Sequence, residues 1–248
     1  MIAKSLAAAA VLLSMSSIQA AEIRVLASNG VKAALEELAP VYERQTGNKL
    51  SITFGLAAVL KRQIESGEPF DFAILTDAGI ADLAKQGKVD SASRVSIARS
   101  GVGIGIKKGA PRADIGTPDA LKRALLDAKS ISWAKEGASG VYFSGLLQKM
   151  GIAEQMKPKV RLADSGAEVG KLVAGGEVQY GVILVNELMA APGVEVLGPL
   201  PAELQNYTAF HGAASTSSNN AAAAWALGKF LTVRAARDVF KAKGQEPG

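Results

Sequence analysis

The chain has 248 residues, of which 48% are hydrophobic and 21% charged, so it is long enough for one large domain or two smaller lobes. It has no cysteine and one histidine, which excludes disulfides, thiol catalysis and zinc sites built from several histidines. Aromatic residues make up 5% and the net charge is +5, with both signs scattered along the chain, so we expect no nucleic-acid partner.

Residues 1–20 have the pattern of a secretory signal peptide. Lys4 is the only charged residue among them, and the apolar run 6–13 is followed by small and polar residues. That run is too short to cross a bilayer. An amphipathic first helix is the alternative, and the lack of a polar face disfavours it. We therefore expect cleavage near Ala20 and export to the periplasm.

Strands and helices alternate from the start of the mature chain. The predicted strands are 22–27, 50–54 and 70–76. The predicted helices are 31–45, 57–66 and 78–86. Pro40 lies inside the first of these helices and should kink or split it. Such an alternation is typical of a parallel sheet with right-handed crossovers.

A second alternation begins after a long glycine-rich strand within 94–107 (SGVGIGIKK). Its predicted helices are 118–127, 140–150 and 167–173. Its predicted strands are 130–133, a segment near Val160, 178–185, 194–197 and 207–210. The tail, 221–243, is predicted to be helical and to return to the first unit.

We interpret this pattern as two α/β lobes that form a hinged clamshell. The first lobe is predicted to comprise 21–98 and 213–248, and the second 99–212. The hinge crossings are expected near 97–101 and within 198–213. A single doubly wound sheet is the alternative that the pattern leaves open. Nothing in the sequence indicates oligomerisation, so we expect a monomer. We also expect neither a metal ion nor a cofactor.

Several catalytic signatures fail on inspection. Residues 101–105 resemble a dinucleotide-binding fingerprint, but Ile106 occupies the position of its third glycine. Residues 137–140 do not form a nucleophile elbow, because valine follows at position 141. His211 lies in a strand-like segment, which favours a hydrogen-bonded or solvent-facing role over a catalytic one.

Turns of glycine and small residues follow several predicted strands, and each opens a helix. They are Ser28-Asn29-Gly30, Gly55-Leu56-Ala57-Ala58, Thr76-Asp77, Ala138-Ser139-Gly140 and Ser165-Gly166. A helix start presents unpaired N–H groups and a partial positive charge, so it can bind an anion. Open α/β sheets bind ligands at this edge. Each turn alone is only a helix cap, but five in facing lobes predict an anion pocket.

The candidate ligand-binding residues are taken from these turns and from the first crossing. They are Ser28, Asn29, Gly30, Ala57, Ala58, Thr76, Arg99, Ser139, Gly140 and Gly166. The alanines would donate backbone N–H groups. Arg99 would clamp a carboxylate with two hydrogen bonds, unless it is a solvated surface arginine.

Three segments carry a resemblance to a known family: IRVLASNGVKAALEELAPVYERQTG, FGLAAVLKRQIESGEPFDFAILTD and ASGVYFSGLLQKMGI. Together they resemble the molybdate-binding proteins of ABC transporters, which are type II periplasmic solute-binding proteins. The most specific piece is LKRQIESGEPFDFAI. The resemblance covers essentially the whole mature chain. It implies two α/β lobes, a small anionic ligand in the cleft between them and an ABC permease as membrane partner.

The ligand motif departs from that family. The family's first-turn serine falls on Gly30, its serine-rich second turn on 56–58, and its tyrosine on about Leu184. Three hydroxyl donors are therefore absent, each worth about 1 kcal/mol or more toward an anion, which disfavours molybdate. Ser28, Asn29 and Arg99 are polar groups that suit an organic acid instead.

These departures lead to a second resemblance, to bacterial aconitate isomerases of the same periplasmic fold. Such an enzyme binds a tricarboxylate and moves an allylic proton, which requires anion anchors, a base and exclusion of water. The candidate bases are Lys61, Lys135, Glu187 and His211, and no spacing selects among them. The leading hypothesis is thus an exported carrier of a small anion, either a molybdate-like oxyanion or a carboxylate. The isomerase is its alternative, and a purely structural domain is the least favoured reading.

Overall fold

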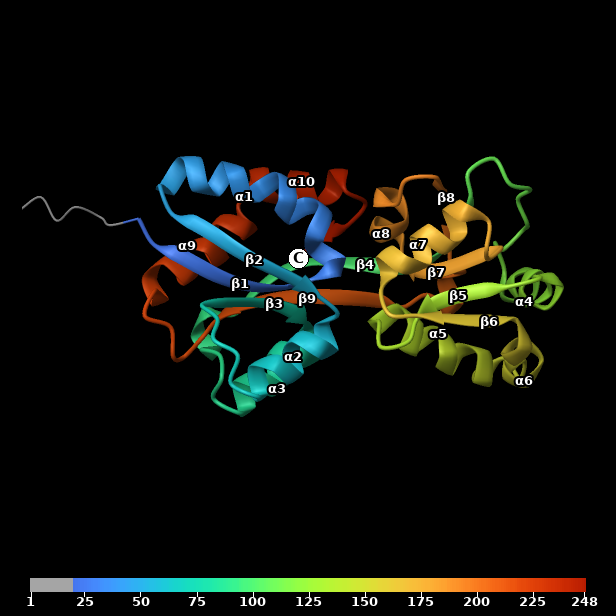
Figure 1. Ribbon diagram of the computed structural model, residues 1–248, viewed down its shortest axis with the longest axis horizontal. Coiled ribbons are helices and arrows are strands. Elements are labelled where there is room, and N and C mark those ends of the chain that lie inside the picture. Colours follow the sequence, from blue (N-terminus) through green and yellow to red (C-terminus); the bar gives the residue numbers. More distant parts are fainter. Residues whose placement is uncertain (1–19) are drawn as a thin grey trace, which may run out of the picture.

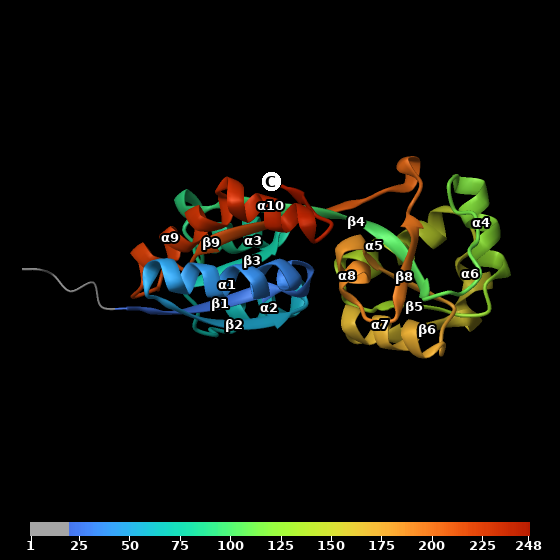
Figure 2. The same ribbon diagram turned by 90° about the horizontal axis from the view of Figure 1, so that it is seen from above.

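The computed structural model describes residues 20–248, which form two α/β lobes side by side along the long axis of the molecule (Figure 1). Residues 1–19 of the predicted signal peptide lie outside the described part. The chain begins and ends in the same lobe, and the view from above shows the two lobes joined by thin connections (Figure 2). The predicted two-lobe architecture is confirmed.

The first lobe is built on a mixed sheet. Its strands are β1 (Glu22–Ser28), β2 (Lys49–Gly55), β3 (Phe72–Thr76), β9 (Tyr207–Ala214), the first half of β4 (Val95–Lys107) and the short β10 (Glu246–Pro247). Strand β1 pairs in parallel with β2 and β3, whereas β9 runs antiparallel to β3 and β4. Its helices are η1 (Asn29–Val31), α1 (Lys32–Thr46), α2 (Ala57–Glu65), α3 (Asp77–Lys85), η2 (Ser91–Ser93), α9 (Ala221–Thr232) and α10 (Arg234–Ala242).

The second lobe repeats this plan with a smaller sheet. Its strands are β5 (Ile131–Ala134), β6 (Val160–Ala163), β7 (Tyr180–Leu184), β8 (Val194–Pro199) and the second half of β4. Strand β5 pairs in parallel with β6 and β7, and β4 pairs antiparallel with β7 and β8. Its helices are α4 (Pro118–Asp127), α5 (Ala138–Lys149), α6 (Ala153–Met156), η3 (Lys157–Lys159), α7 (Gly166–Gly175), α8 (Val185–Ala190) and η4 (Ala202–Leu204).

Two strands connect the lobes. Residues 95–101 of β4 pair with β9 in the first lobe, and residues 102–107 pair with β7 and β8 in the second. The chain returns through β9, which pairs with β3 from Thr76–Phe210 to Phe72–Ala214. Strand β9 thus lies in the sheet of the first lobe, although the predicted boundary at 212/213 assigned most of it to the second.

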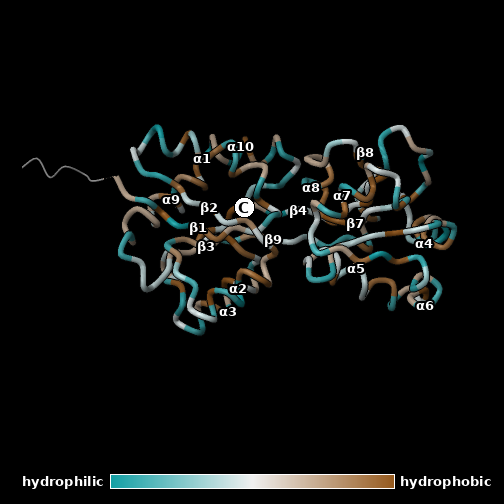
Figure 3. Tube along the Cα trace, in the orientation of Figure 1, coloured by the Kyte–Doolittle hydropathy of each residue, from teal (hydrophilic) through white to brown (hydrophobic). Residues whose placement is uncertain are grey.

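The cores follow the apolar patterns of the sequence. Residues 72–75 of β3 are fully buried, as the continuous apolar run of this strand predicts. Hydrophobic segments gather along the strands inside each lobe, and hydrophilic ones lie in the outer turns (Figure 3). No helix among residues 20–248 is both long and apolar enough to cross a bilayer.

Some local predictions are wrong. Helix α1 is not split at Pro40, because the proline faces solvent while Leu35, Leu38 and Tyr42 hold both halves of the helix in the core. The helical tail is two helices, since Val233 is extended between α9 and α10. The predicted strand 178–185 ends at Leu184, where the unpredicted helix α8 begins.

Candidate functional site

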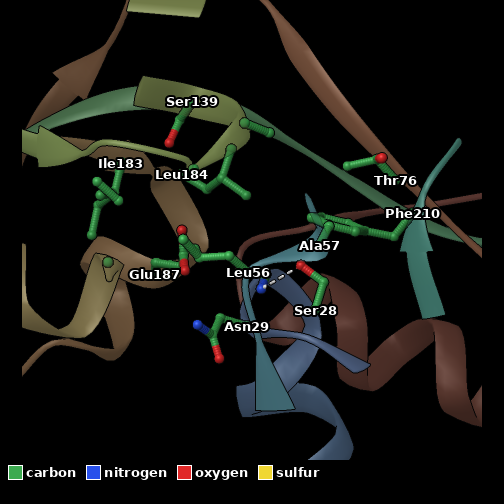
Figure 4. A pocket seen from close by; sticks show the side chains of 15 residues that line it. Ser28, Asn29, Leu56, Ala57, Thr76, Ser139, Ile183, Leu184, Glu187 and Phe210 are labelled. Carbon is green, nitrogen blue, oxygen red and sulfur yellow. Dashed lines mark hydrogen bonds between the residues drawn. The ribbon is translucent and has the colours of Figure 1, made fainter. Parts of the chain in front are cut away.

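The predicted turns converge on one pocket between the lobes (Figure 4). The space between its atoms amounts to about 400 Å³ when the solvent-open part is included. Turns of both lobes supply its lining, which consists of Ser28, Asn29, Gly30, Leu56, Ala57, Thr76, Ala134, Gly137, Ala138, Ser139, Gly166, Ile183, Leu184, Glu187 and Phe210. Among residues 20–248, no lysine, arginine or histidine lines it.

Helix N-termini provide the positive potential of this pocket. The helices that start at it are η1–α1, α2 and α3 from the first lobe and α5 and α7 from the second. Side chains cap some of them: Ser28 Oγ accepts from Gly30 N at 3.3 Å, and Thr76 Oγ accepts from Gly79 N at 3.3 Å. Helices α2 and α5 have no side-chain cap. Their first N–H groups are therefore available to an anion, one set from each lobe.

Glu187 is the one carboxyl group in the lining within the described chain. It lies in the first turn of α8, with its side chain among the turns of both lobes (Figure 4). Burial raises its pKa to about 7, although a hydrogen bond with the backbone of Leu184 acts in the opposite direction. A Cβ at position 166 would lie 2.9 Å from Glu187 Oε1, so Gly166 leaves the room that this carboxyl occupies. Glu187 can therefore exist in both protonation states near neutral pH.

One wall of the pocket is apolar and rigid. Phe210 of β9 is 1% exposed, and its ring fills the space that a side chain at position 30 would need. Leu56 and Leu184 contribute further apolar surface. Gly30 and Leu184 therefore offer no side-chain hydroxyl to the pocket, and a Cβ at position 30 would overlap the ring of Phe210.

The structure separates the predicted site residues into two groups. Seven line the pocket: Ser28, Asn29, Gly30, Ala57, Thr76, Ser139 and Gly166. Ala58, Gly140 and Arg99 do not. Gly140 instead allows α5 to approach β5, since a Cβ there would lie 2.7 Å from Trp133 Cδ1. Arg99 lies at the crossing as predicted, but it pairs with Glu246 (Nε to Oε2, 2.8 Å) and covers the ring of Tyr207.

The candidate bases are also separated. Glu187 lines the pocket, whereas Lys61 does not and pairs with Glu65, one turn further along α2, at 2.7 Å. Lys135 lines a different surface depression, over α5 and β6. His211 is half-buried, with Nδ1 3.3 Å from Asp77 Oδ1, and burial lowers its pKa. Within the described residues, no group of three or more histidine, aspartate or glutamate side chains is arranged to hold a metal ion.

A groove connects the pocket to solvent between α1 and the helices α7 and α8. It shares Asn29, Gly166 and Glu187 with the pocket, and small residues form much of its surface. Lys32 of α1 and Lys171 of α7 lie along it. The groove thus leads an anionic ligand past Lys171 and past Lys32, which pairs with Glu36 at 3.7 Å, toward Glu187.

Helix α8, which carries Glu187, is the element beside the pocket that the sequence does not predict. It is only six residues long, and its apolar positions continue those of β7, so its hydrophobic pattern does not distinguish it from strand. The polar pair Asn186-Glu187 directly after the buried strand was the available signal. It matches the other five turns in position, at the carboxyl end of a strand.

Residues 23–246 match the family described as bacterial extracellular solute-binding proteins. The chain belongs to this family. The resemblance inferred from the sequence segments is therefore confirmed, and the two-lobe fold with a pocket between the lobes is the fold of such solute-binding proteins.

Relatives of this solute-binding protein have different activities. The chain is 32% identical to an aconitate isomerase from Pseudomonas sp, over 98% of this chain and 96% of the relative. It is 25% identical to the molybdate-binding protein ModA of Escherichia coli (strain K12), over 90% of this chain and 88% of the relative. The structure of the periplasmic molybdate-binding protein from Azotobacter vinelandii superimposes with a TM-score of 0.77 at 18% identity, covering 91% and 99% of the two chains.

Proposed function

We propose that this protein binds an unsaturated tricarboxylate in the cleft and interconverts cis- and trans-aconitate, with Glu187 as its acid and base. The observation that carries this proposal is a carboxyl group inside a pocket of helix N-termini. A carboxylate that faces an anion weakens simple binding, but it is the group that proton transfer requires. The raised pKa of Glu187, about 7, suits both halves of such a transfer.

The reaction needs one proton to move and consumes no other reactant. The Glu187 carboxylate removes a proton from the methylene carbon of aconitate. The electron pair of that C–H bond then spreads over three carbons and the attached carboxylates. The neutral Glu187 carboxyl returns a proton to the former vinylic carbon, so the double bond shifts by one position and forms again as cis or trans.

The pocket supplies the stabilisation that this intermediate needs. Negative charge grows on the substrate carboxylates as the proton leaves, and the uncapped N-termini of α2 and α5 lie on opposite sides of the pocket. The apolar wall of Leu56, Leu184 and Phe210 excludes water from the carbanion.

The test is an isomerisation assay with the purified protein and cis-aconitate in D₂O, followed by ¹H NMR. We expect trans-aconitate to form, with the substrate proton retained wherever Glu187 returns it before exchange with D₂O, and Glu187→Gln to lower the rate by a factor of about 10² or more. Glu203→Gln, an exposed carboxyl in η4, is the matched control and should retain full activity. Wild-type activity in the Glu187→Gln variant would refute the assignment.

A carrier function is the second candidate, and the two-lobe fold of the family favours it. In this case the signal peptide is cleaved near Ala20, and the mature protein acts in the periplasm as a monomer. There it delivers an anion to an ABC permease. Ser28, Asn29, Ala57, Ser139 and Gly166 would hold the ligand. A ligand at a hundred times its dissociation constant adds about 2.7 kcal/mol of stability. Thermal unfolding with molybdate, tungstate and both aconitates therefore identifies the ligand, and stabilisation by an aconitate without any turnover would favour the carrier.

A further inference from the structure

A buried hydrogen bond joins the two lobes directly beside Glu187. The side-chain amide of Asn186 in α8 donates from Nδ2 to the carbonyl oxygen of Gly30 in η1, at 2.8 Å. Gln245 donates from Nε2 to the same oxygen at 3.1 Å. Asn186 is 2% exposed and Gln245 is 3% exposed. The Gly30 carbonyl of the first lobe is thus held from both sides.

The C-terminal segment 244–247 ties this contact to the hinge. Gly244 has a φ of +81°, and its backbone lies so close to α8 that an added Cβ would be 3.7 Å from the Cα of Asn186. Glu246 then pairs with Arg99 in the antiparallel β10–β4 ladder. The segment therefore contacts the hinge strand β4, the helix α8 and the Gly30 carbonyl together.

The amides have few other partners. Neither Asn186 Oδ1 nor Gln245 Oε1 accepts a hydrogen bond, although both atoms are buried. Unpaired buried acceptors disfavour this arrangement of the lobes, whereas the bonds to Gly30 favour it. A ligand that contacts both lobes would add to the side that holds them together.

We propose that Asn186 is a positioning residue: its hydrogen bond to Gly30 forms on closure of the cleft and places the Glu187 carboxyl among the helix N-termini. Gln245 of the C-terminal segment orients the Gly30 carbonyl for this bond. The inference rests on the proposed function. It means that contacts at the interface between the lobes assemble the catalytic site.

Few other charges act on Glu187. Among residues 20–248, no other titratable side chain lines the pocket. The charged residues along the adjoining groove are Lys32 and Glu36 of α1 and Lys171 of α7, and Lys32 pairs with Glu36 at 3.7 Å. The exclusion of water from Glu187 by the two lobes is thus the main influence on its pKa that a change at Asn186 would alter.

The test combines Asn186→Ala, Asn186→Leu and Gln245→Ala in the full mature chain. The pKa of Glu187 is measured by ¹³C NMR of its side-chain carboxyl, and kcat and KM by the aconitate assay. We expect the Asn186 variants to lower this pKa by about one unit or more from its value of about 7, because water reaches the carboxyl. We expect kcat to fall about tenfold, with a smaller change of the same sign in Gln245→Ala.

Asn48→Ala is the matched control. Asn48 is a buried asparagine whose hydrogen bonds, from Ala21 N and to Tyr42 Oη, stay within the first lobe. Its loss should lower the melting temperature without changing the pKa of Glu187 or kcat. An unchanged pKa and kcat in the Asn186 variants would overturn the inference. A lowered pKa in a protein that does not isomerise aconitate would support the positioning role and refute the proposed reaction.

Discussion

At the scale of the residue, the distinctive feature of the site is the Glu187 carboxyl, which has no cationic side chain beside it in the described lining. Glu187 lies in a pocket without a lysine, arginine or histidine in its described lining, so no cation holds it ionised. Burial is the main cause of its raised pKa, about 7. Because the raised pKa couples protonation of Glu187 to folding, the pH dependence of stability reports on this carboxyl directly.

Glu187→Gln should stabilise the protein at alkaline pH. The pKa of Glu187 is about 7 in the folded chain against an ordinary value of 4.5, so the folded state binds more protons between these values. The contribution of this carboxyl is present in full below pH 4.5 and is lost as the pH rises through 7. We expect the variant to gain about 3 °C or more in melting temperature at pH 8 and little at pH 4.5. A gain of the same size at both pH values would contradict this explanation.

Gly30→Ser tests why the site lacks a hydroxyl at its first turn. The new Cβ would meet the buried ring of Phe210, so we expect a loss of about 1–3 kcal/mol in the free energy of unfolding. Gly145→Ser in α5, where nothing lies within 4 Å of an added Cβ, is the control and should cost little. In the double variant with Phe210→Ala the two losses should not add. Strict additivity would show that the ring is not the obstacle.

At the scale of the element, the helix starts determine the chemistry of the pocket. Serine or threonine caps η1, α3 and α7, whereas α2 and α5 begin after Leu56 and Gly137 without a side-chain cap. An uncapped start retains free N–H groups that a ligand can use. The proposed ligand would accept hydrogen bonds at these two helix starts, one in each lobe.

Ala57→Pro removes one such donor at little structural cost. Ala57 is the first residue of α2, where proline is well tolerated, and the preceding Leu56 already has the extended conformation that proline requires (φ −67°, ψ 134°). We expect the affinity for the anion to fall about fivefold to tenfold, measured by calorimetry, with a nearly unchanged melting temperature. Ala57→Gly retains the N–H group and should bind nearly as well. Equal affinities of the two variants would show that this N–H group is not used.

At the scale of the whole molecule, the lobes are connected by the strands β4 and β9 and by side-chain contacts across the pocket. Asn186 bonds Gly30 on one side of the pocket. On another side Arg62 of α2 pairs with Glu136, which precedes α5, at 2.5 Å. The ion pair is exposed, so its contribution to closure is small compared with that of a buried contact.

Arg62→Glu should weaken ligand binding by a factor of about 2 to 5, because it replaces an attraction between the lobes by a repulsion. The charge-swapped pair Arg62→Glu with Glu136→Arg should restore the affinity. Arg161→Glu breaks a similarly exposed pair with Glu177 within the second lobe and should have no effect. Binding that changes equally in the Arg62 and Arg161 variants would indicate a general charge effect, and would exclude a role in closure.

The sequence by itself determined the alternation of strands and helices and the positions of the turns. The apolar run of β3 and the helical spacing of apolar residues in α1 are local signals, which short stretches of the sequence carry without any tertiary contact. The grouping of the turns within each lobe also followed, because parallel strands bring their carboxyl ends to one edge of a sheet.

The tertiary structure alone decided what the pocket contains. Arg99 was placed in the cleft by its position in the chain, but Glu246, which is 147 residues away, pairs with it at the hinge. Glu187 was one of four candidate bases, and only the packing of α8 between the lobes distinguishes it. The ring of Phe210, which is also distant in the sequence, fills the space that a side chain at position 30 would need. Such contacts join residues that are distant in the sequence, so the local periodicity of the sequence carries no information about them. The burial and charge of the site depend on these contacts.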